Sequence, residues 1–318
     1  MLLEIRNLSV EFDSEDRRIL AVDNVSLTLE RGQVLGLVGE SGCGKSAACM
    51  CIPRLLPSPP AHIPSGQILF DGIDLMKTPV EKLRKIRGNR ISVIFQDPMT
   101  ALSPLHRIAE QLQELIHLHR NVSRKESYTI AVEWLEKVGI PDAAVKAKAW
   151  PHELSGGMQQ RVMIAMALLL EPDLVIADEP TTALDVTIQA QVLRLMRELH
   201  RKESALLLIT HDMGVVYQMA THIAVMYAGQ IVETAEAKRF FQSPRHPYSQ
   251  ALLRALPSSA TRGRRLEAIP GYVPSPGNYP SGCRFHNRCS KAMNKCREIV
   301  PELTEIANGH YARCLLYD

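Results

Sequence analysis

The stretch GESGCGKS spaces two glycines, a lysine and a serine in the pattern G-x-x-x-x-G-K-[ST]. Glycines let backbone N–H groups turn inward around phosphate oxygens, and a helix that follows presents its N-terminus to the anion. Lys45 is expected to reach the β- and γ-phosphates, and the Ser46 hydroxyl to ligate Mg²⁺. The alternative, a glycine-rich turn with a surface lysine, is disfavoured because an apolar run precedes the motif. The predicted nucleotide-binding residues of this loop are Gly39, Glu40, Ser41, Gly42, Cys43, Gly44, Lys45, Ser46 and Ala47.

Two acidic residues follow an apolar run in the stretch LVIADEP. A strand that ends in a carboxylate is expected to place Asp178 where it holds Mg²⁺ through water. Glu179 then stands where it can polarise an attacking water as a general base. The alternative is a strand that ends in two solvated acids, which the phosphate-binding loop (P-loop) in the same chain disfavours.

A second helix start suited to an anion occurs in LSGGMQQR. Ser155 is a favoured helix cap, and Gly156 and Gly157 leave the first backbone N–H groups of the helix accessible. Two such helix starts in one chain are hard to satisfy with one nucleotide in one monomer.

The overall composition limits the class of protein. The 318 residues suffice for one large domain with an appendage, or for two domains. A formal charge of +3 and 5% aromatic residues argue against a nucleic-acid partner. Glu4 and Arg6 interrupt the first apolar residues, and no apolar run approaches the ~20 residues that span a bilayer. We therefore expect a soluble cytoplasmic chain, whose seven cysteines are reduced thiols or metal ligands.

Elements that must position these residues are visible as apolar runs. QVLGLVG, ISVIFQ, LVIADE and ALLLIT predict strands covered on both faces, whereas NVSLTLE predicts a strand with one exposed face. IAVMYAGQIVE predicts a hairpin, and amphipathic stretches predict a mostly helical subdomain over about 98–170. The fold class is α/β. We expect a principal domain over 1–235 and an extension over 236–318, which contains a proline- and glycine-rich connector poor in regular structure.

The order of these motifs resembles that of the ATP-binding-cassette (ABC) transporter ATPases, whose signature motif reads LSGGQ. The resemblance covers residues 1 to about 255 and implies a P-loop NTPase of the ABC type with a helical subdomain. Met158 stands where the family usually has glutamine, a variant that we associate with peptide importers.

Four further positions match the family one by one. Taken singly, each has an ordinary alternative, such as a core histidine or a turn, but together they form a set. They are Gln96 of the Q-loop, which contacts Mg²⁺ and senses the membrane partner; Asp185 of the D-loop; His211, the switch histidine at the γ-phosphate; and Phe12, an aromatic that stacks on adenine.

The resemblance implies an ATPase whose catalytic residues are Glu179, His211 and Gln96. Ser46, Gln96 and Asp178 are the implied Mg²⁺ ligands. Two such domains would close head-to-tail, with ATP between one P-loop and the segment Ser155–Gly157 of the other. Closure completes the site, and in-line attack of water assisted by Glu179 reopens it.

Two stretches limit the class of solute that is transported. DEPTTALDVTIQAQVL and SPRHPYSQALLRALP look like the ATPase subunits of bacterial dipeptide and oligopeptide permeases, closest to the D-type ATPase of the dipeptide permease. The implied partners are a second, different ATPase chain, two integral membrane permease subunits and a periplasmic or lipid-anchored binding protein, with no nucleic acid. The implied location is peripheral, at the cytoplasmic face of the bacterial inner membrane.

Two alternatives stay open. A related importer ATPase for nickel or other solutes would have nearly the same core. A soluble ABC protein that remodels nucleic acid or ribosomes is disfavoured, because such proteins usually carry two cassettes or a long coiled coil.

Four clustered cysteines lie near the end of the chain. Structural zinc sites favour cysteine pairs two to four residues apart, which the spacing Cys283-x5-Cys289-x6-Cys296-x17-Cys314 lacks. Four thiolates suit a [4Fe–4S] cluster, although the spacing matches no common ferredoxin pattern. The resemblance to peptide permeases also implies an iron–sulfur cluster; zinc or free thiols are the alternatives. The expected role is a structural clip for a segment too small to build its own core, with redox sensing second.

Other residues near these cysteines allow two interpretations. The residues Arg284, Arg288, Lys291, Lys295 and Arg297 either offset the charge of a thiolate-ligated cluster or form a solvated basic surface. His286 and His310 are expected to be solvated loop histidines rather than substitute ligands. Cys49 and Cys51 are expected to face the core as small hydrophobic side chains.

Overall fold

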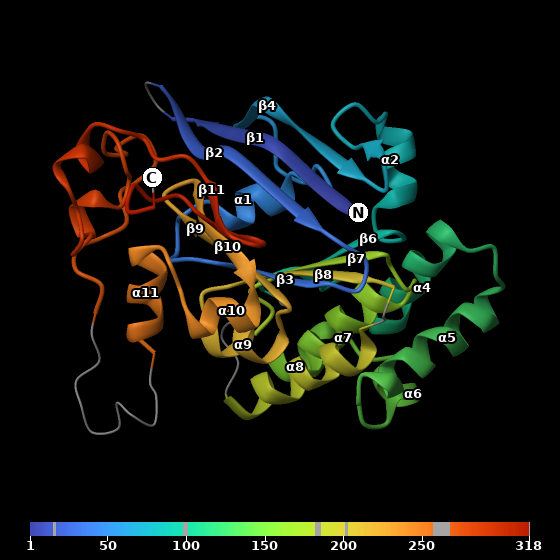
Figure 1. The fold of residues 1–318 in the computed structure, drawn as a ribbon. Coiled ribbons are helices and arrows are strands. Elements are labelled where there is room, and N and C mark those ends of the chain that lie inside the picture. Colours follow the sequence, from blue (N-terminus) through green and yellow to red (C-terminus); the bar gives the residue numbers. More distant parts are fainter. Residues whose placement is uncertain (15–16, 98–100, 182–185, 201–202, 257–267, 318) are drawn as a thin grey trace. The chain divides into compact units, whose positions relative to one another are not determined.

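The computed structural model describes residues 1–14, 17–97, 101–181, 186–200, 203–256 and 268–317. Its internal contacts divide the chain into two compact units, which we describe separately (Figure 1). The first unit comprises Met1–Lys77 and Leu208–Asp318, and the second comprises Thr78–Leu207. Strand β8 (Ala205–Thr210) crosses the boundary between these ranges.

The N-terminal part of the first unit forms an antiparallel sheet. Its strand order is β2-β1-β4-β5, and its strands are β1 (Leu3–Asp13), β2 (Arg18–Leu29), β4 (Ala61–Phe70) and β5 (Ile73–Asp74). In β2, Val25, Leu27 and Leu29 are buried and alternate with exposed residues, which confirms the strand with one exposed face. Period-two burial of this kind is what a half-solvated antiparallel sheet requires.

A second sheet of the first unit holds the strand that precedes the P-loop. Its order is β11-β12-β10-β9-β3, followed by β8, and its strands include β3 (Val34–Val38), β9 (His222–Tyr227), β10 (Gln230–Glu236), β11 (Thr304–Ala307) and β12 (His310–Ala312). All five residues of β3 are buried, as its continuous apolar run predicts. Strands β9 and β10 form the predicted antiparallel hairpin.

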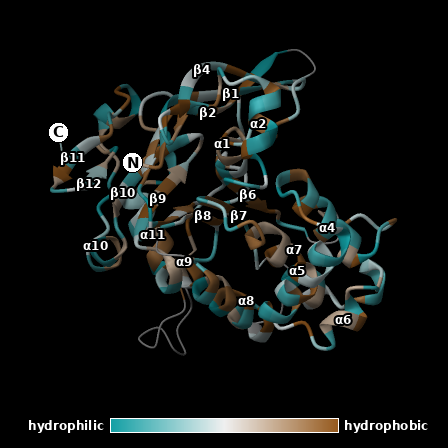
Figure 2. Cartoon of the chain, turned by 90° about the vertical axis from the view of Figure 1, so that its right-hand side faces the viewer, coloured by the Kyte–Doolittle hydropathy of each residue, from teal (hydrophilic) through white to brown (hydrophobic). Residues whose placement is uncertain are grey.

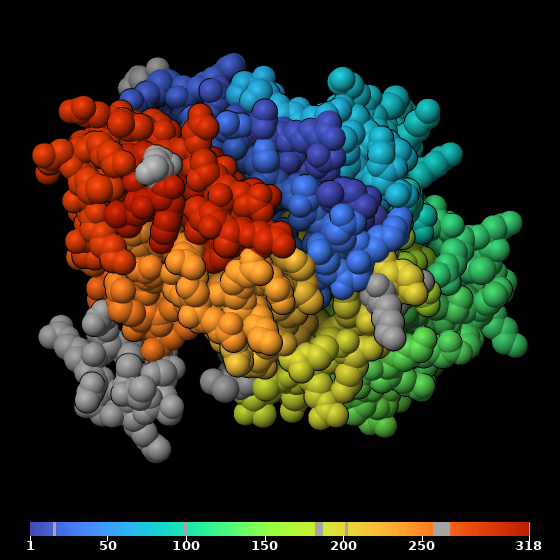
Figure 3. Space-filling model, in the orientation of Figure 1, coloured from blue at the N-terminus to red at the C-terminus, as the bar shows by residue number. Residues whose placement is uncertain are grey.

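The C-terminal extension contributes strands to this sheet. Strand β12 pairs antiparallel with β10, with Glu233 opposite Ala312, and β11 pairs with β12. Residues 268–282 contain no helix or strand, as expected for the proline- and glycine-rich connector. In Figure 3 the C-terminal residues (red) lie against N-terminal residues (blue). One contact between these segments is the hydrogen bond that Arg17 donates to the Asn278 side chain at 3.5 Å. The extension therefore packs on the first unit instead of forming a body of its own.

The helices of the first unit are short. They are α1 (Lys45–Met50), α9 (Met213–Met219), α10 (Ala237–Gln242), α11 (Pro247–Arg254) and the 3₁₀ turns η3 (His286–Arg288) and η4 (Asn294–Arg297). Phe240 of α10, Tyr248 of α11 and Phe285, the residue before η3, join Val225 and Tyr227 of β9 in one buried cluster. The aromatic cluster explains how a short extension attaches to the sheet.

The second unit is mostly helical, as predicted for 98–170. Its elements are α2 (Val80–Ile86), β6 (Ile91–Ile94), α4 (Ile108–His119), α5 (Arg124–Lys137), α6 (Ala143–Lys146), η1 (Pro151–Glu153), α7 (Gly156–Leu168), β7 (Leu174–Asp178) and α8 (Val186–Leu199). Strands β6 and β7 are parallel. Helix α8 buries Val192, Leu193 and Met196 and exposes Gln191 and Arg194, so it carries both colours in Figure 2. Within the described residues, no helix is long and apolar enough to cross a bilayer.

Candidate functional site

The P-loop follows β3 directly and has a backbone that only glycine fits at two positions. A Cβ at Gly39 would lie 2.1 Å from the Met226 carbonyl oxygen. At Gly44 the backbone is left-handed, with φ of 103°, and a Cβ would lie 2.6 Å from the carbonyl oxygen of Ala21. The two glycines thus allow the loop to turn tightly against neighbouring strands, as a phosphate-binding loop requires.

The Lys45 side chain lies back across the P-loop. It is 5% exposed, and its ammonium group donates to the carbonyl oxygens of Gly39 at 2.8 Å and Glu40 at 3.0 Å. A positive charge is thereby held inside the loop, where phosphate oxygens would be bound. Ser46 is exposed at the first turn of α1, and Cys43 is fully buried, with the pKa of its thiol raised by burial.

Two other predicted residues lie in the first unit. His211 follows β8 immediately and is exposed, and β8 stands beside β3 in the strand order. The carboxyl ends of these two strands therefore carry the histidine and the P-loop. Phe12 is half-buried in β1, opposite Ile19 of β2 and Ala61 of β4.

The second unit brings Gln96 and Glu179 together. Asp178 ends β7 and is 6% exposed, and Glu179 follows it. The side-chain amide of Gln96 donates to Glu179 at 3.3 Å between Nε2 and Oε2. Glu179 has a left-handed backbone, with φ of 46°, which is uncommon for a residue other than glycine. Backbone strain of this kind tends to occur at functional sites.

Helix α7 begins as the signature stretch predicts. The Ser155 hydroxyl caps the helix by accepting from the Met158 N–H at 3.4 Å, and Ser155 and Gly156 are exposed. Gln159, which follows the substituted position, is buried and donates to the carbonyl oxygens of Pro151 and Leu154. The Gln159 amide therefore stabilises the turn before the helix and is not exposed to solvent. Asp185 lies outside the described residues.

The four tail cysteines line one small cavity, together with His246 and His286. Backbone N–H groups point at two of the sulfurs: Lys291 donates to Cys289 Sγ and Met293 to Cys296 Sγ, each at 3.4 Å. Burial raises the pKa of the Cys283 thiol to about 11. Burial therefore favours the neutral thiol over the thiolate at this position.

Among the residues that the structure describes, no group of three or more His, Cys, Asp or Glu side chains is arranged to hold one metal ion.

Of the basic residues near the cysteines, Lys291, Lys295 and Arg297 are exposed, which agrees with a solvated basic surface. That interpretation is wrong for Arg284 and Arg288, whose side chains are 14% and 6% exposed. They pair with Asp23 and Glu40 of the N-terminal segment, so their charges are already matched by carboxylates. His310 is 1% exposed and not a loop histidine in solvent, because its Nε2 bonds Glu233 at 2.7 Å. None of these partners could be read from local sequence, since each lies more than 70 positions away.

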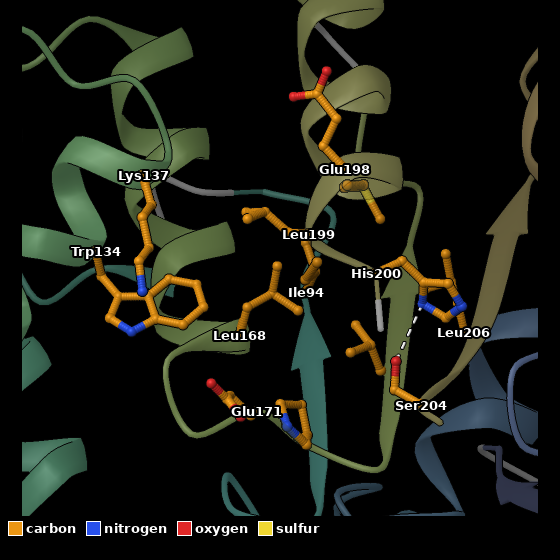
Figure 4. A pocket seen from close by; sticks show the side chains of 13 residues that line it. Ile94, Trp134, Lys137, Leu168, Glu171, Glu198, Leu199, His200, Ser204 and Leu206 are labelled. Carbon is orange, nitrogen blue, oxygen red and sulfur yellow. Dashed lines mark hydrogen bonds between the residues drawn. The ribbon is translucent and has the colours of Figure 1, made fainter. Parts of the chain in front are cut away.

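A separate cavity of about 230 Å³ lies inside the second unit (Figure 4). Its walls are mainly apolar, and Trp134, Leu168 and Leu206 contribute to them, with Lys137 and His200 among the polar residues. Gln96, Asp178 and Glu179 do not line it. The sequence did not indicate this cavity, because its lining comes from several elements.

Comparisons with known proteins agree with this geometry. The family model described as ABC transporter matches residues 22–182, and the one described as Oligopeptide/dipeptide transporter, C-terminal region, matches residues 232–296. The dipeptide transport ATP-binding protein DppD of Escherichia coli (strain K12) is 46% identical over 314 residues, which cover 98% of this chain and 96% of that protein. The oligopeptide transport ATP-binding protein AppD of Bacillus subtilis (strain 168) is 48% identical over 318 residues, which cover 100% and 97%.

A solved structure shares the fold. It is the dimeric structure of a post-hydrolysis state of the ATP-binding cassette MJ0796 bound to ADP and Pi, with a TM-score of 0.67 and 28% identity. The similarity covers 74% of this chain and 99% of that chain. Taken with the family matches and the P-loop geometry, these similarities show that the chain belongs to the ABC transporter family.

Proposed function

We propose that the chain is the ATP-hydrolysing subunit of a bacterial importer for dipeptides or oligopeptides. The observation that carries this proposal is the match of residues 232–296 to the C-terminal region of oligopeptide and dipeptide transporters. The ATPase core alone does not discriminate among solutes, whereas nearly all of this region lies beyond residue 235. Relatives named as peptide transport ATP-binding proteins, aligned over nearly the whole chain, support the same substrate class. In this proposal residues 1–235 form the ATPase domain and 236–318 its extension.

The site residues have separate tasks in ATP hydrolysis. Lys45 and the P-loop backbone bind the phosphates, and Phe12 packs against the adenine. Ser46, Gln96 and Asp178 would hold Mg²⁺, which when bound neutralises charge on the phosphates. Glu179 accepts a proton from the attacking water, and Gln96 orients the Glu179 carboxylate through the hydrogen bond between them. His211 donates to the γ-phosphate.

In this proposal the exposed start of α7 binds a nucleotide that is held by a second ATPase chain. Ser155 and Gly156 present a capped helix N-terminus to solvent, which favours binding of the nucleotide held by a partner chain. The related cassette solved as a dimer with ADP and Pi supports such an arrangement. ATP-driven closure of this pair would move two membrane permease subunits, while a separate binding protein selects the peptide.

The expected location follows from these partners. A subunit that binds the permeases is peripheral, at the cytoplasmic face of the inner membrane. Expressing the chain with its permease subunits and isolating it from membranes tests this assignment. Recovery of the chain with two polytopic membrane proteins supports it, whereas recovery with ribosomes or nucleic acid would contradict it.

Transport measurements then identify the solute. Vesicles that contain the assembled importer and its binding protein should accumulate labelled dipeptide or oligopeptide. Accumulation should require ATP on the side of the membrane where this chain is bound. Unlabelled peptide should compete, and Ni²⁺ should not. Competition by Ni²⁺ alone would instead favour the alternative, an importer for nickel.

We also propose that the four tail cysteines hold a [4Fe–4S] cluster that clips the extension together. Their convergence on one cavity and the two N–H···S contacts support this proposal. The extension has little apolar core of its own, so a metal clip would supply folding free energy. Protein purified without oxygen should contain about four iron atoms and four sulfides per chain. Zinc in place of iron would support the zinc alternative, and neither metal above background would overturn the assignment.

A further inference from the structure

The C-terminal extension contacts the P-loop through one ion pair. Both terminal nitrogens of Arg288 donate to the Glu40 carboxylate, at 2.8 Å and 2.9 Å. Arg288 is in η3, beside Cys289, and Glu40 is the first residue after Gly39 in the P-loop. The Arg288 side chain is 6% exposed and that of Glu40 is 30% exposed. A two-pronged pair with this burial is stronger and more directional than a surface ion pair.

A second contact reaches the backbone of the same residue. The Glu40 N–H donates to the Tyr248 hydroxyl at 2.8 Å, and Tyr248 is a fully buried residue of α11. The Glu40 carbonyl oxygen accepts from Lys45 at 3.0 Å. The extension thus holds the N–H and the carboxylate of Glu40, while Lys45 donates to its carbonyl oxygen. Any displacement of Glu40 would therefore move a hydrogen-bond acceptor of Lys45.

The residues that hold Glu40 are themselves packed firmly. Tyr227 and Tyr248 have ring centroids 4.6 Å apart, and Phe285 lies 5.2 Å from Tyr227. The Arg288 guanidinium also donates to the Tyr227 hydroxyl at 3.4 Å. Because the Arg288 guanidinium carbon lies 5.8 Å from the Tyr227 ring centroid and 6.0 Å from that of Phe285, Arg288 has little freedom to leave Glu40.

We propose that Arg288 and Tyr248 are positioning residues for ATP binding, which hold the P-loop through Glu40 from outside the ATPase core. This inference rests on the proposed function, because it assumes that the P-loop binds ATP. It goes further, because the extension then contributes to ATP binding in addition to packing on the sheet. Loss of either contact should weaken ATP binding more than it slows the chemical step, because neither residue touches the reacting groups.

The test uses the full chain and mant-ATP, a fluorescent ATP analogue, as the probe. Arg288→Gln and Glu40→Gln should each raise the dissociation constant at least about 10-fold, the equivalent of one charged hydrogen bond. The double variant should bind mant-ATP as tightly as either single variant, since each single substitution already removes the same interaction. Arg288→Lys should recover part of the affinity, because one donor to Glu40 is restored. In the assembled importer, KM for ATP should rise more than kcat falls.

One control variant and one further test variant separate positioning from misfolding. Arg297→Gln removes an exposed arginine of the same tail and should leave the affinity unchanged. Tyr248→Phe deletes a single hydroxyl from a packed ring and should raise the dissociation constant without changing the circular dichroism spectrum. If wild-type protein binds mant-ATP and the Arg288 and Tyr248 variants bind it equally well, positioning is overturned and the proposed function stands. If wild-type protein itself fails to bind, the proposed function is at fault.

Discussion

Gln96 and Glu179 are joined by a hydrogen bond across 83 positions of sequence, at 3.3 Å between Nε2 and Oε2. Ile94 of β6 lies opposite Ala177 of the parallel strand β7, so both side chains follow the same edge of the sheet two residues later. The left-handed backbone of Glu179 costs on the order of 1 kcal/mol, which the surrounding structure must offset. The amide of Gln96 thus orients the carboxylate that we assign as general base.

Glu179→Gln removes the base and keeps the shape of the side chain. In the assembled importer kcat for ATP should fall roughly 10²- to 10⁴-fold, the usual contribution of a general base, while mant-ATP binding stays close to wild type. Steady-state phosphate release and a binding titration measure the two quantities. Glu133→Gln, an exposed change in α5, serves as the control and should alter neither. A wild-type kcat in Glu179→Gln would remove the residue from the mechanism.

Gln96→Ala should lower kcat because the Glu179 carboxylate loses its donor. We expect a decrease of about 10-fold, equivalent to one hydrogen bond to a charged group. In a Glu179→Gln background the same substitution should have little further effect on kcat, since the two residues act as a unit. A double-mutant cycle on kcat tests this, and fully additive losses would show that Gln96 acts through another contact.

Lys45→Ala should weaken mant-ATP binding at least about 10-fold. The ammonium group is the buried positive charge of the P-loop, and its loss also frees the carbonyl oxygens of Gly39 and Glu40. Lys82→Ala, at an exposed position of α2, is the matched lysine control. Equal affinity of the Lys45 and Lys82 variants would contradict the assignment of the loop.

Glu233→Gln should loosen the attachment of the extension. The Glu233 carboxylate is fully buried and accepts from the N–H groups of Arg245 and His246 and from His310. The glutamine amide would place an N–H₂ donor opposite one of these N–H donors. We expect this to lower the free energy of unfolding by about 3 kcal/mol. Hydrogen exchange at Arg245 and His246 measures the local opening. Glu236→Gln, at the exposed end of the same strand, should leave that exchange unchanged.

Cys289→Ala should abolish iron binding, and Cys51→Ala should not. Cys51 is a core thiol whose pKa burial raises to about 12, and its sulfur donates to the Ala47 carbonyl oxygen at 3.2 Å. Removing iron from wild-type protein with a chelator and an oxidant should lower the melting temperature and expose the extension to protease. Iron content equal to wild type in the Cys289 variant would end its assignment as a ligand.

Local pattern predicted much of the fold. Continuous apolar runs identified β3, β7 and β8, and alternation identified one face of β2, because burial imposes a period on each kind of strand. The serine cap of α7 was likewise predictable, since a cap acts within four residues. The burial of His310 was not predictable, because the local sequence of β12 is typical of a solvated turn. Only the pairing of β12 with β10 buries this histidine.

The sequence by itself determined the P-loop, the acids after β7 and the capped start of α7, because each depends on spacing within a few residues. Tertiary structure alone decided which residues hold Glu40 and where the four cysteines meet. Those contacts join segments as far as 248 positions apart, and no local periodicity records them. Long-range packing of the aromatic side chains places Arg288 and Tyr248 on the P-loop, so an extension that seemed separate from the ATPase core in sequence holds part of its site.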